Sequence, residues 1–288
     1  MRIAAVLTSF NRRCQTLKAL TALQVASVNA DAQTEIILVD DASTDGTADA
    51  VRTAFPQATV LAGSGDLFWN RGMHLGVQQA LQRDVDFILW LNDDTLLHRD
   101  SLQRLLLESD SLAQREGRPV VLVGAMVGPD GRVSYGGLVS VGRIRRLTYR
   151  RVWSATEAVR CDVMEGNCVL LPMPLARAVG NLDPTYEHAF GDTDYALRAA
   201  KSGFAVYVAP GFMGECADNP VQGSFKDRNL PLRTRWRAAM SRKGLPWRTW
   251  LHFTRSHGGW LWPAQFAWPY CRIVLSWALN RIARRFRK

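Results

Sequence analysis

The sequence predicts an open, mostly parallel α/β sheet of the Rossmann-like kind, flanked by helices and followed by a helical, basic appendage. Short apolar runs that predict strands cover residues 2–10, 35–40, 58–63, 86–92 and 119–127. Segments with helical spacing alternate with them, at 13–28, 47–55, 71–82 and 99–115. Near-continuous apolar runs are typical of strands buried on both faces, and strand–helix alternation favours a parallel sheet.

The expected helices carry start signals, and the second half of the chain has a different pattern. The segment at 43–47 and the pair Asp100-Ser101 have the Ser, Thr and Asp residues that are typical of helix starts. After about residue 128 the chain becomes rich in turn residues. The remaining expected elements are a strand pair or one bent strand at 161–172, a short helix ending at Gly180, a helix over 192–203 with acidic residues in its first turn, and a strand over 204–210.

The charge of the chain is unevenly distributed. Of 288 residues, 36 are Lys or Arg and 26 are Asp or Glu, which gives a formal net charge of +10. From Arg228 to the end there are 14 basic residues and no acidic one, together with seven of the ten tryptophans. The first 227 residues therefore have 22 basic and 26 acidic side chains. This boundary predicts a main domain over 1–227 and an appendage over 228–288.

The appendage is predicted to associate with an anionic membrane surface. Its uncharged run, 256–271, has 16 residues and two prolines, whereas a bilayer span needs about 20 apolar residues. Tryptophan next to Arg and Lys is typical of interfacial segments that lie on anionic lipid. The alternative is a solvated basic helix packed on the main domain. Nucleic acid is not the expected partner, because no nucleic-acid-binding motif is present and the main domain is slightly acidic.

The cysteines and the N-terminus both favour a cytoplasmic protein. The five cysteines form no Cys-x-x-Cys pair and no metal-binding spacing with histidine, which indicates reduced thiols. The first apolar run is too short for a signal peptide and predicts a strand instead. Together with the appendage, these features predict a protein peripheral on the inner face of the plasma membrane.

Three predicted strands end on polar or acidic residues: Thr8 to Asn11, Asp40-Asp41, and Asn92-Asp93-Asp94. Ligands of open α/β sheets gather outside the carboxyl ends of the strands, so these tips are the candidate site. The alternative is that they are ordinary turn residues. In an extended backbone, Asn92 and Asp94 would point to one face and Asp93 to the other. Carboxylate and amide oxygens suit Mg²⁺ or Mn²⁺, and the lack of a Walker-type glycine loop disfavours kinases and ATPases.

Several motifs, taken in order, resemble the family 2 glycosyltransferases. They are LTSFNRR (7–13), ILVDDASTDGT (37–47), LNDDT (91–95) and GDTDYALRAAKSGF (191–204). The segments GSGDLFWNRGMHLGVQQA (63–80) and SRKGLPWRTWLHFTRSHGG (241–259) are similar to the bacterial rhamnosyltransferase-like branch. The resemblance covers nearly the whole chain. It implies the GT-A fold and an inverting reaction that uses a nucleotide-sugar.

The resemblance also implies roles for individual residues. Asp192 would be the catalytic base, and Asp94 the direct metal ligand with Asp93 beside it. Asp40 would accept a hydrogen bond from a uracil or thymine ring. The implied donor-binding residues are Thr8, Phe10, Asn11, Asp40, Asp41, Gly65, Asp66, Asn70, Arg71, Gly72, Asn92 and Asp93.

The chain departs from the family pattern at two places near these residues. Gly191 stands where the family commonly has an acidic residue before the base, so Asp192 could instead only cap the helix that follows. Relatives often have a histidine after the last core strand that reaches the metal, where this chain offers Glu215 or Cys216. Asp194 lies four residues before Arg198 and predicts an ion pair on the helix surface.

The expected function is therefore the transfer of a sugar, with rhamnose favoured, from a dTDP- or UDP-sugar to a hydroxyl of a bacterial surface polysaccharide or lipid-linked glycan. A sugar-phosphate nucleotidyltransferase is an alternative, but it would need a glycine-rich loop after the first strand. A non-catalytic relative that binds donor or glycan is the other alternative. The donor sugar, the acceptor, the linkage and the oligomeric state are not predicted by the sequence.

Overall fold

The computed structural model describes residues 1–142 and 147–285, with side chains as far as Leu279. The chain forms two compact units, each built from separate segments. The first comprises Met1–Val139, Arg150–Glu187 and Gly191–Asp218; the second comprises Ser140–Tyr149, His188–Phe190 and Asn219–Lys288. The basic residues expected at 281–288 lie outside the described side chains.

The first unit is built on one large mixed sheet in the order β10-β13-β6-β12-β4-β1-β2-β3. Its strands along this path are β1 (Arg2–Ser9), β2 (Gln33–Asp40), β3 (Thr59–Ala62), β4 (Phe87–Leu91), β6 (Val121–Val127), β10 (Val159–Cys161), β12 (Cys168–Pro172) and β13 (Val206–Glu215). The strands β4, β1, β2 and β3 are mutually parallel, whereas β12 runs antiparallel to both β4 and β6. The predicted mostly parallel sheet is therefore confirmed, with one antiparallel strand at its centre.

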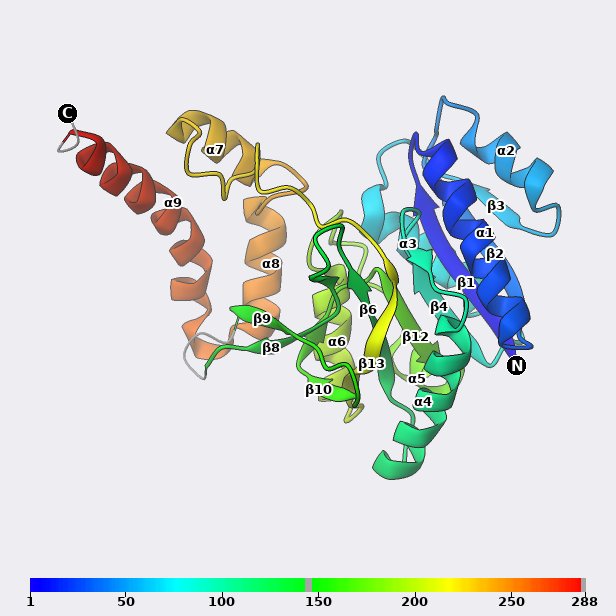
Figure 1. The fold of residues 1–288 in the computed structure, drawn as a ribbon. Coiled ribbons are helices and arrows are strands. Elements are labelled where there is room, and N and C mark those ends of the chain that lie inside the picture. Colours follow the sequence, from blue (N-terminus) through cyan, green and yellow to red (C-terminus); the bar gives the residue numbers. More distant parts are fainter. Residues whose placement is uncertain (143–146, 286–288) are drawn as a thin grey trace. The chain divides into compact units, whose positions relative to one another are not determined.

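Several shorter strands accompany the large sheet, and helices cover this sheet on both faces (Figure 1). The short strands are β5 (Leu96–Leu97), β7 (Val133–Tyr135), β8 (Gly137–Ser140), β9 (Tyr149–Val152) and β11 (Val163–Met164). The helices are α1 (Arg13–Asn29), α2 (Thr47–Ala54), α3 (Phe68–Ala80), α4 (Ser101–Glu116), α5 (Met173–Val179) and α6 (Gly191–Lys201). Helices α1 and α4 lie over one face, and α3, α5 and α6 over the other.

The core forms because the central strands are apolar on both faces. All five residues of β4 are buried, including Trp90. Along β1, Ile3, Ala5 and Leu7 belong to the core on the α1 side. Val6 and Thr8 point the other way, toward glycines of α3. This alternation follows from the two-residue period of a strand.

Helix α3 lies unusually close to the sheet because two glycines face it. A Cβ atom at Gly72 would come within 2.2 Å of Thr8 Oγ1, and one at Gly76 within 2.4 Å of Val6 Cγ1. Any side chain at these positions would force the helix away from β1. The close approach sets where the N-terminus of α3, with Trp69, Asn70 and Arg71, meets the tips of the strands.

Three local predictions need correction. The strand expected over 204–210 continues to Glu215, because the chain passes Pro210 and Gly211 through an irregular register and pairs again with β6. Asp100 makes no capping hydrogen bond to α4; its carboxylate lies 3.6 Å from Arg104 instead. The chain after Leu91 forms a turn instead of continuing as an extended strand.

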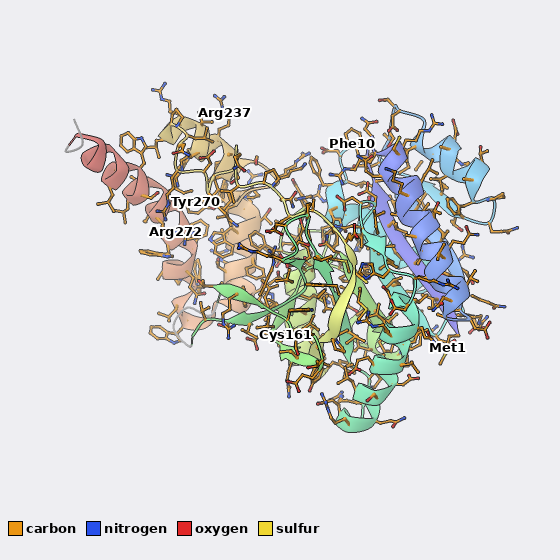
Figure 2. All side chains as sticks on the ribbon, viewed as in Figure 1. Met1, Phe10, Cys161, Arg237, Tyr270 and Arg272 are labelled. Atoms are coloured by element: carbon orange, nitrogen blue, oxygen red, sulfur yellow. The ribbon has the colours of Figure 1, made fainter. Side chains whose placement is uncertain are left out.

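The second unit contains α7 (Leu232–Met240), α8 (Trp247–His257), the short helix η1 (Gly259–Leu261) and α9 (Trp262–Arg285). The buried guanidinium of Arg235 joins α7 to α9 through Ser276 Oγ at 3.0 Å. Tyr270 of α9, labelled in Figure 2, donates to the Leu245 carbonyl at 2.8 Å. Phe190 stacks on Phe253 at 5.0 Å between ring centroids. Helix α9 continues through Pro269. No helix in the described part of the chain is long and apolar enough to span a bilayer.

Candidate active site

The carboxyl ends of β1, β2 and β4 meet at one edge of the sheet, and hydrogen bonds join the first two tips. Asn11 follows β1 with a positive φ of 53°, a conformation that asparagine tolerates better than most residues. Its side-chain oxygen accepts a hydrogen bond from the Thr44 backbone N–H at 2.8 Å, and its own N–H donates to Ser43 Oγ at 2.9 Å. Phe10 beside it is 52% exposed (Figure 2).

The tip of β4 is a turn that brings both carboxylates to one guanidinium. Strand β4 ends at Leu91, and the Thr95 N–H donates to the Asn92 carbonyl at 3.2 Å. Arg12 Nη1 donates to Asp93 Oδ1 at 3.2 Å and to Asp94 Oδ2 at 2.6 Å. The expectation that Asp93 and Asp94 point to opposite faces is therefore wrong, because the backbone turns before it reaches them.

The two carboxylates differ in their surroundings. Asp93 is buried, and this burial raises the pKa of its carboxyl group to about 6, although Arg12 and Ser9 oppose the shift. Asp94 is more exposed and accepts a weak hydrogen bond from Cys216 Sγ at 3.6 Å. Cys216 thus lies where the sequence analysis placed a residue that reaches the metal. Burial raises the pKa of its thiol to about 12.

Asp40 and Asp41, at the end of β2, have different hydrogen-bond partners. Asp41 accepts hydrogen bonds from the backbone N–H groups of Gly65, Leu67 and Phe68 at 2.7–3.1 Å. It therefore holds the loop that contains Gly65 and the exposed Asp66. Asp40 accepts from the Ser43 N–H at 3.2 Å through Oδ2, while its buried Oδ1 has no hydrogen-bond partner among the described residues. A buried carboxylate oxygen without a partner is costly, which makes Asp40 a candidate acceptor for a ligand.

The side chains of Asn70 and Arg71, at the start of α3, both donate hydrogen bonds to backbone carbonyls of the protein itself. Asn70 is fully buried and its amide N–H₂ group donates to the carbonyls of Asp183 and Tyr186 at 2.8 and 2.7 Å. Arg71 Nε donates to the Pro184 carbonyl at 3.0 Å, and its Nη2 lies 3.6 Å from Glu187. Both residues thereby hold the 183–187 segment, which leads toward Asp192.

Asp192 lies within the first turn of α6 and binds the 166–167 segment, which also contacts the tip of β4. Its Oδ2 accepts from the Gly166 N–H at 3.0 Å and its Oδ1 from the Thr193 N–H at 2.7 Å. The carbonyl of the next residue, Asn167, accepts from the Asn92 N–H at 3.1 Å. Asp192 and Asn92 are therefore attached to consecutive residues. Burial raises the pKa of Asp192, and the two N–H donors limit the shift.

Trp69 lies between Asn92 and Asp192. Its Nε1–H donates to Asn92 Oδ1 at 2.7 Å. A Cβ atom at Gly166 would come within 2.4 Å of the Trp69 ring and 3.4 Å of Asp192 Cβ. The absence of a side chain at residue 166 thus allows the indole and the carboxylate to approach the same backbone.

The neighbours of Asp192 explain one departure from the family pattern and correct another expectation. A Cβ atom at Gly191 would lie 1.6 Å from Asn70 Oδ1, so an acidic residue has no room there. Asp194 does pair with Arg198, at 2.8 Å, but it is buried rather than on the helix surface.

A second ion cluster lies next to the site. Arg151 binds Glu165 through two hydrogen bonds of 2.9 Å and Asp218 through two of 2.8 and 3.5 Å. Burial raises the pKa of Glu165 against the effect of Arg151, and the charge of Asp192 adds to the rise. This cluster positions the segment that supplies the Gly166 N–H.

The residues at the tip of β4 do not, as arranged here, form a site for a resident divalent cation. One oxygen of each carboxylate is bound to Arg12, and the side-chain oxygen of Asn92 is bound to Trp69. Among the described residues, no three metal-ligating side chains come together. The predicted Mg²⁺ or Mn²⁺ would therefore have to displace Arg12 from these carboxylates.

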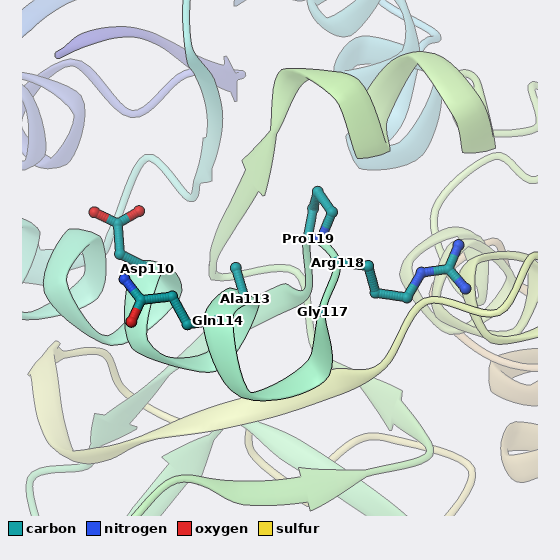
Figure 3. A pocket seen from close by; sticks show the side chains of 6 residues that line it. All are labelled: Asp110, Ala113, Gln114, Gly117, Arg118 and Pro119. Atoms are coloured by element: carbon teal, nitrogen blue, oxygen red, sulfur yellow. The ribbon is translucent and has the colours of Figure 1, made fainter.

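A hollow elsewhere in this unit is not the site. It has a volume of about 450 Å³ and lies at the end of α4, lined by Asp110, Ala113, Gln114, Gly117, Arg118 and Pro119 (Figure 3). It is open to solvent and contains none of the strand-tip residues. Arg12 and Arg151 were given no role by the sequence, since each binds carboxylates far away along the chain.

The family described as "Glycosyl transferase family 2" matches residues 5–164. No curated protein matches the sequence.

Similar solved structures include S. aureus TarS, with a TM-score of 0.53 and 13% identity over 88% of this chain and 42% of that one. The 1–349 fragment of S. aureus TarS in complex with UDP has a TM-score of 0.52 and 13% identity, over 87% of this chain and 69% of that one. The mannosyltransferase PcManGT from Pyrobaculum calidifontis, in complex with GDP-Man and Mn²⁺, has a TM-score of 0.50 and 17% identity, over 88% and 61%.

These identities are low, so the likeness to solved structures concerns the fold. The chain spans less than half of TarS and about three fifths of PcManGT. The family match covers more than half of this chain, and the mixed sheet flanked by helices is that of the GT-A fold. The chain therefore belongs to glycosyl transferase family 2 and has the GT-A fold.

Proposed function

We propose that the protein is an inverting glycosyltransferase that moves a sugar, rhamnose being the expected one, from a dTDP- or UDP-sugar to a hydroxyl of a bacterial surface polysaccharide or lipid-linked glycan. One observation carries the proposal. The Asp192 carboxylate is attached through Gly166 to the segment that also binds the tip of β4. The proposed base and the proposed donor-binding edge of the sheet are thus held by the same segment, residues 166–167.

The reaction needs one proton acceptor and one leaving group. The acceptor hydroxyl oxygen forms a bond to the anomeric carbon while the bond from that carbon to the diphosphate oxygen breaks. The bonding electron pair leaves with the diphosphate, and the hydroxyl proton passes to Asp192. Attack opposite the leaving group inverts the anomeric centre. The raised pKa of Asp192 improves its match to this task, since a general base works best when its pKa lies near the working pH.

The donor side of the proposal rests on the tips of β1 and β2. Asp40 Oδ1 is buried and unpartnered among the described residues, so it suits the ring N–H of a uracil or thymine base. The exposed ring of Phe10 offers a surface for the base or ribose. Asp41 and Asn70 support the donor site indirectly, by holding the loop after β3 and the segment before α6. Two of the similar structures hold UDP and GDP-Man, which agrees with a nucleotide-sugar donor.

Divalent metal ions are common in this family, and one similar structure contains Mn²⁺. In this chain Mg²⁺ or Mn²⁺ remains a prediction, with Asp94 and Asp93 as its candidate ligands. Such an ion would have to compete with Arg12, which binds both carboxylates.

Replacement of the proposed base tests the function. Asp192→Asn keeps the shape of the side chain but cannot accept the proton, so we expect transfer to fall by about 10²–10⁴-fold. Nucleotide binding should remain within about threefold, because Asp192 contacts no predicted donor residue directly. Transfer or donor hydrolysis is measured over a panel of nucleotide-sugars, and binding by calorimetry.

Asp110→Asn is the matched control, since Asp110 is an exposed carboxylate at the hollow of Figure 3. Equal turnover by wild type and Asp192→Asn would remove the base assignment.

We also propose that the second unit attaches the enzyme to the cytoplasmic face of the plasma membrane, where a lipid-linked acceptor would lie. Trp268, Leu275 and Leu279 are exposed on α9 at helical spacing, and Trp260 before it is 86% exposed. The sequence from Arg228 onward has no acidic residue to repel anionic lipid. Exposed apolar side chains beside cations are what an interfacial helix presents to a bilayer.

Vesicle sedimentation tests this attachment. Burial of each large apolar side chain contributes about 1.5–3 kcal/mol, so the combined change Trp268→Ser, Leu275→Ser and Leu279→Ser should weaken binding at least tenfold. The vesicles contain phosphatidylcholine with phosphatidylglycerol, and phosphatidylcholine alone serves as comparison. Val28→Ser with Leu107→Ser is the control, because both residues are exposed and apolar in the first unit. Unchanged sedimentation of the triple variant would contradict the proposal.

A further inference from the structure

We propose that Arg12 is the built-in cation of this active site: it neutralises Asp93 and Asp94 and contacts the leaving diphosphate, so that binding of a nucleoside diphosphate requires no divalent metal. The inference rests on the proposed function, whose donor supplies the diphosphate. It concerns Arg12, to which the sequence motifs assigned no role.

The contacts of Arg12 place a positive charge where a metal ligand set was expected. A single nitrogen, Nη1, reaches Asp93 at 3.2 Å and Asp94 at 2.6 Å. A cation between two carboxylates at the end of a strand is the arrangement expected of the metal, and here a side chain of the same chain provides it. The guanidinium of arginine stays protonated in proteins, so this charge is permanent.

The rest of the guanidinium remains available. Arginine has five N–H donors in a planar fork that matches phosphate oxygens. Among the described residues, the side-chain hydrogen bonds of Arg12 all use Nη1, and 44% of the side chain is exposed. Nε and Nη2 can therefore donate to a phosphate while Nη1 stays on the carboxylates.

The position of Arg12 is determined by the fold. It lies directly before α1, which begins at Arg13, and its carbonyl accepts from the Thr16 N–H and from Thr16 Oγ1, both at 2.9 Å. Thr16 Oγ1 in turn lies 2.8 Å from Ser9 Oγ at the end of β1. The backbone of Arg12 is thus held at the tip of β1, next to Phe10 and Asn11 on the proposed donor side.

Electrostatics then predicts what the loss of Arg12 does. Without it, two carboxylates would face the diphosphate with no compensating charge, and binding would weaken unless a metal ion entered. The same loss frees both carboxylates to bind that metal. Removal of the charge should therefore convert a metal-independent site into a metal-dependent one.

Two titrations on the full chain test the proposal with wild type, Arg12→Gln and the neighbouring control Arg13→Gln. The first follows Mn²⁺ alone by electron paramagnetic resonance. The second follows UDP by calorimetry, once in EDTA and once with Mn²⁺. Arg13 is suited as control because its backbone N–H, not its side chain, donates to Asp45 at 2.9 Å.

Hydrogen bonds to charged groups contribute enough to change affinity about tenfold or more. We expect Arg12→Gln to bind Mn²⁺ at least about tenfold more tightly than wild type, and to bind UDP at least about tenfold more weakly in EDTA, with recovery in Mn²⁺. Wild type and Arg13→Gln should bind UDP about equally in both conditions.

Either of two results overturns the proposal: wild type that loses its UDP affinity in EDTA, or Arg12→Gln that binds Mn²⁺ no more tightly than wild type. A protein that binds UDP in neither condition contradicts the proposed donor class instead. The Mn²⁺ titration then decides the role of Arg12 without the nucleotide.

Discussion

At residue 191, where the family commonly has an acidic side chain, this chain has glycine for a steric reason. The space that a Cβ atom would occupy is filled by the side-chain oxygen of Asn70, 1.6 Å from the ideal position. Asn70 donates to two carbonyls of the segment that leads to α6. It can occupy this position because residue 191 is glycine. The glycine therefore gives no support to a non-catalytic relative.

Asp93 predicts a pH dependence of stability. The pKa of its carboxyl group is about 6 in the folded protein, above the ordinary 3.8, so the folded state binds this proton more tightly than the unfolded chain. Stability from this group is therefore full below about pH 4 and falls as the pH rises toward 6. A shift of two units corresponds to about 3 kcal/mol at most.

The measurement compares urea unfolding of wild type and Asp93→Asn between pH 4 and 7. The difference in unfolding free energy, wild type minus variant, should decrease as the pH rises through this window. The raised pKa values of Asp192 and Glu165 affect both proteins alike and cancel. Parallel pH profiles would show that Asp93 has an ordinary pKa.

At the scale of elements, the contact between α3 and β1 places the site. Gly76→Ala would bring a Cβ atom within 2.4 Å of Val6 Cγ1 and 3.3 Å of Val39 Cγ2. Overpacking of this kind costs about 1–3 kcal/mol. We expect a lower thermal midpoint and weaker nucleotide binding, since α3 carries Trp69 and Asn70. Gln78→Ala, at an exposed position of the same helix, should change neither; an equal effect of both substitutions would contradict the close packing.

The elements show which features a sequence can predict. The central strands were predicted because β4 and its neighbours are apolar on both faces, and that pattern is local. The strand β13 was predicted to end near Pro210, because proline and glycine usually end strands, but pairing with β6 on both sides of the irregularity continues it.

The pairing of Arg12 with Asp93 joins residues 81 positions apart. Local periodicity does not contain such a contact. The same holds for Gly166 and Asp192, 26 positions apart. The candidate site was thus predicted as a set of strand tips, whereas the partners that hold each tip came from the three-dimensional structure.

At the scale of the whole molecule, the two compact units do not follow the composition boundary near residue 228. The second unit includes His188–Phe190, and Phe190 packs on Trp250 and Phe253 at 5.2 and 5.0 Å. Truncation at residue 228 would remove these ring partners, so it would disturb packing as well as any membrane surface. Substitution of exposed residues on α9 tests the attachment without this loss.

The central claim is that a nucleoside diphosphate binds at the tips of β1, β2 and β4, with its phosphates at Arg12 and on the side of Asp192. A crystal structure of the protein with UDP tests it most directly. The account predicts the uracil ring hydrogen-bonded to Asp40, the diphosphate within hydrogen-bond distance of Arg12 Nε or Nη2, and the terminal phosphate facing Asp192. UDP bound elsewhere, or a diphosphate that contacts neither Arg12 nor the β4 tip, would contradict it.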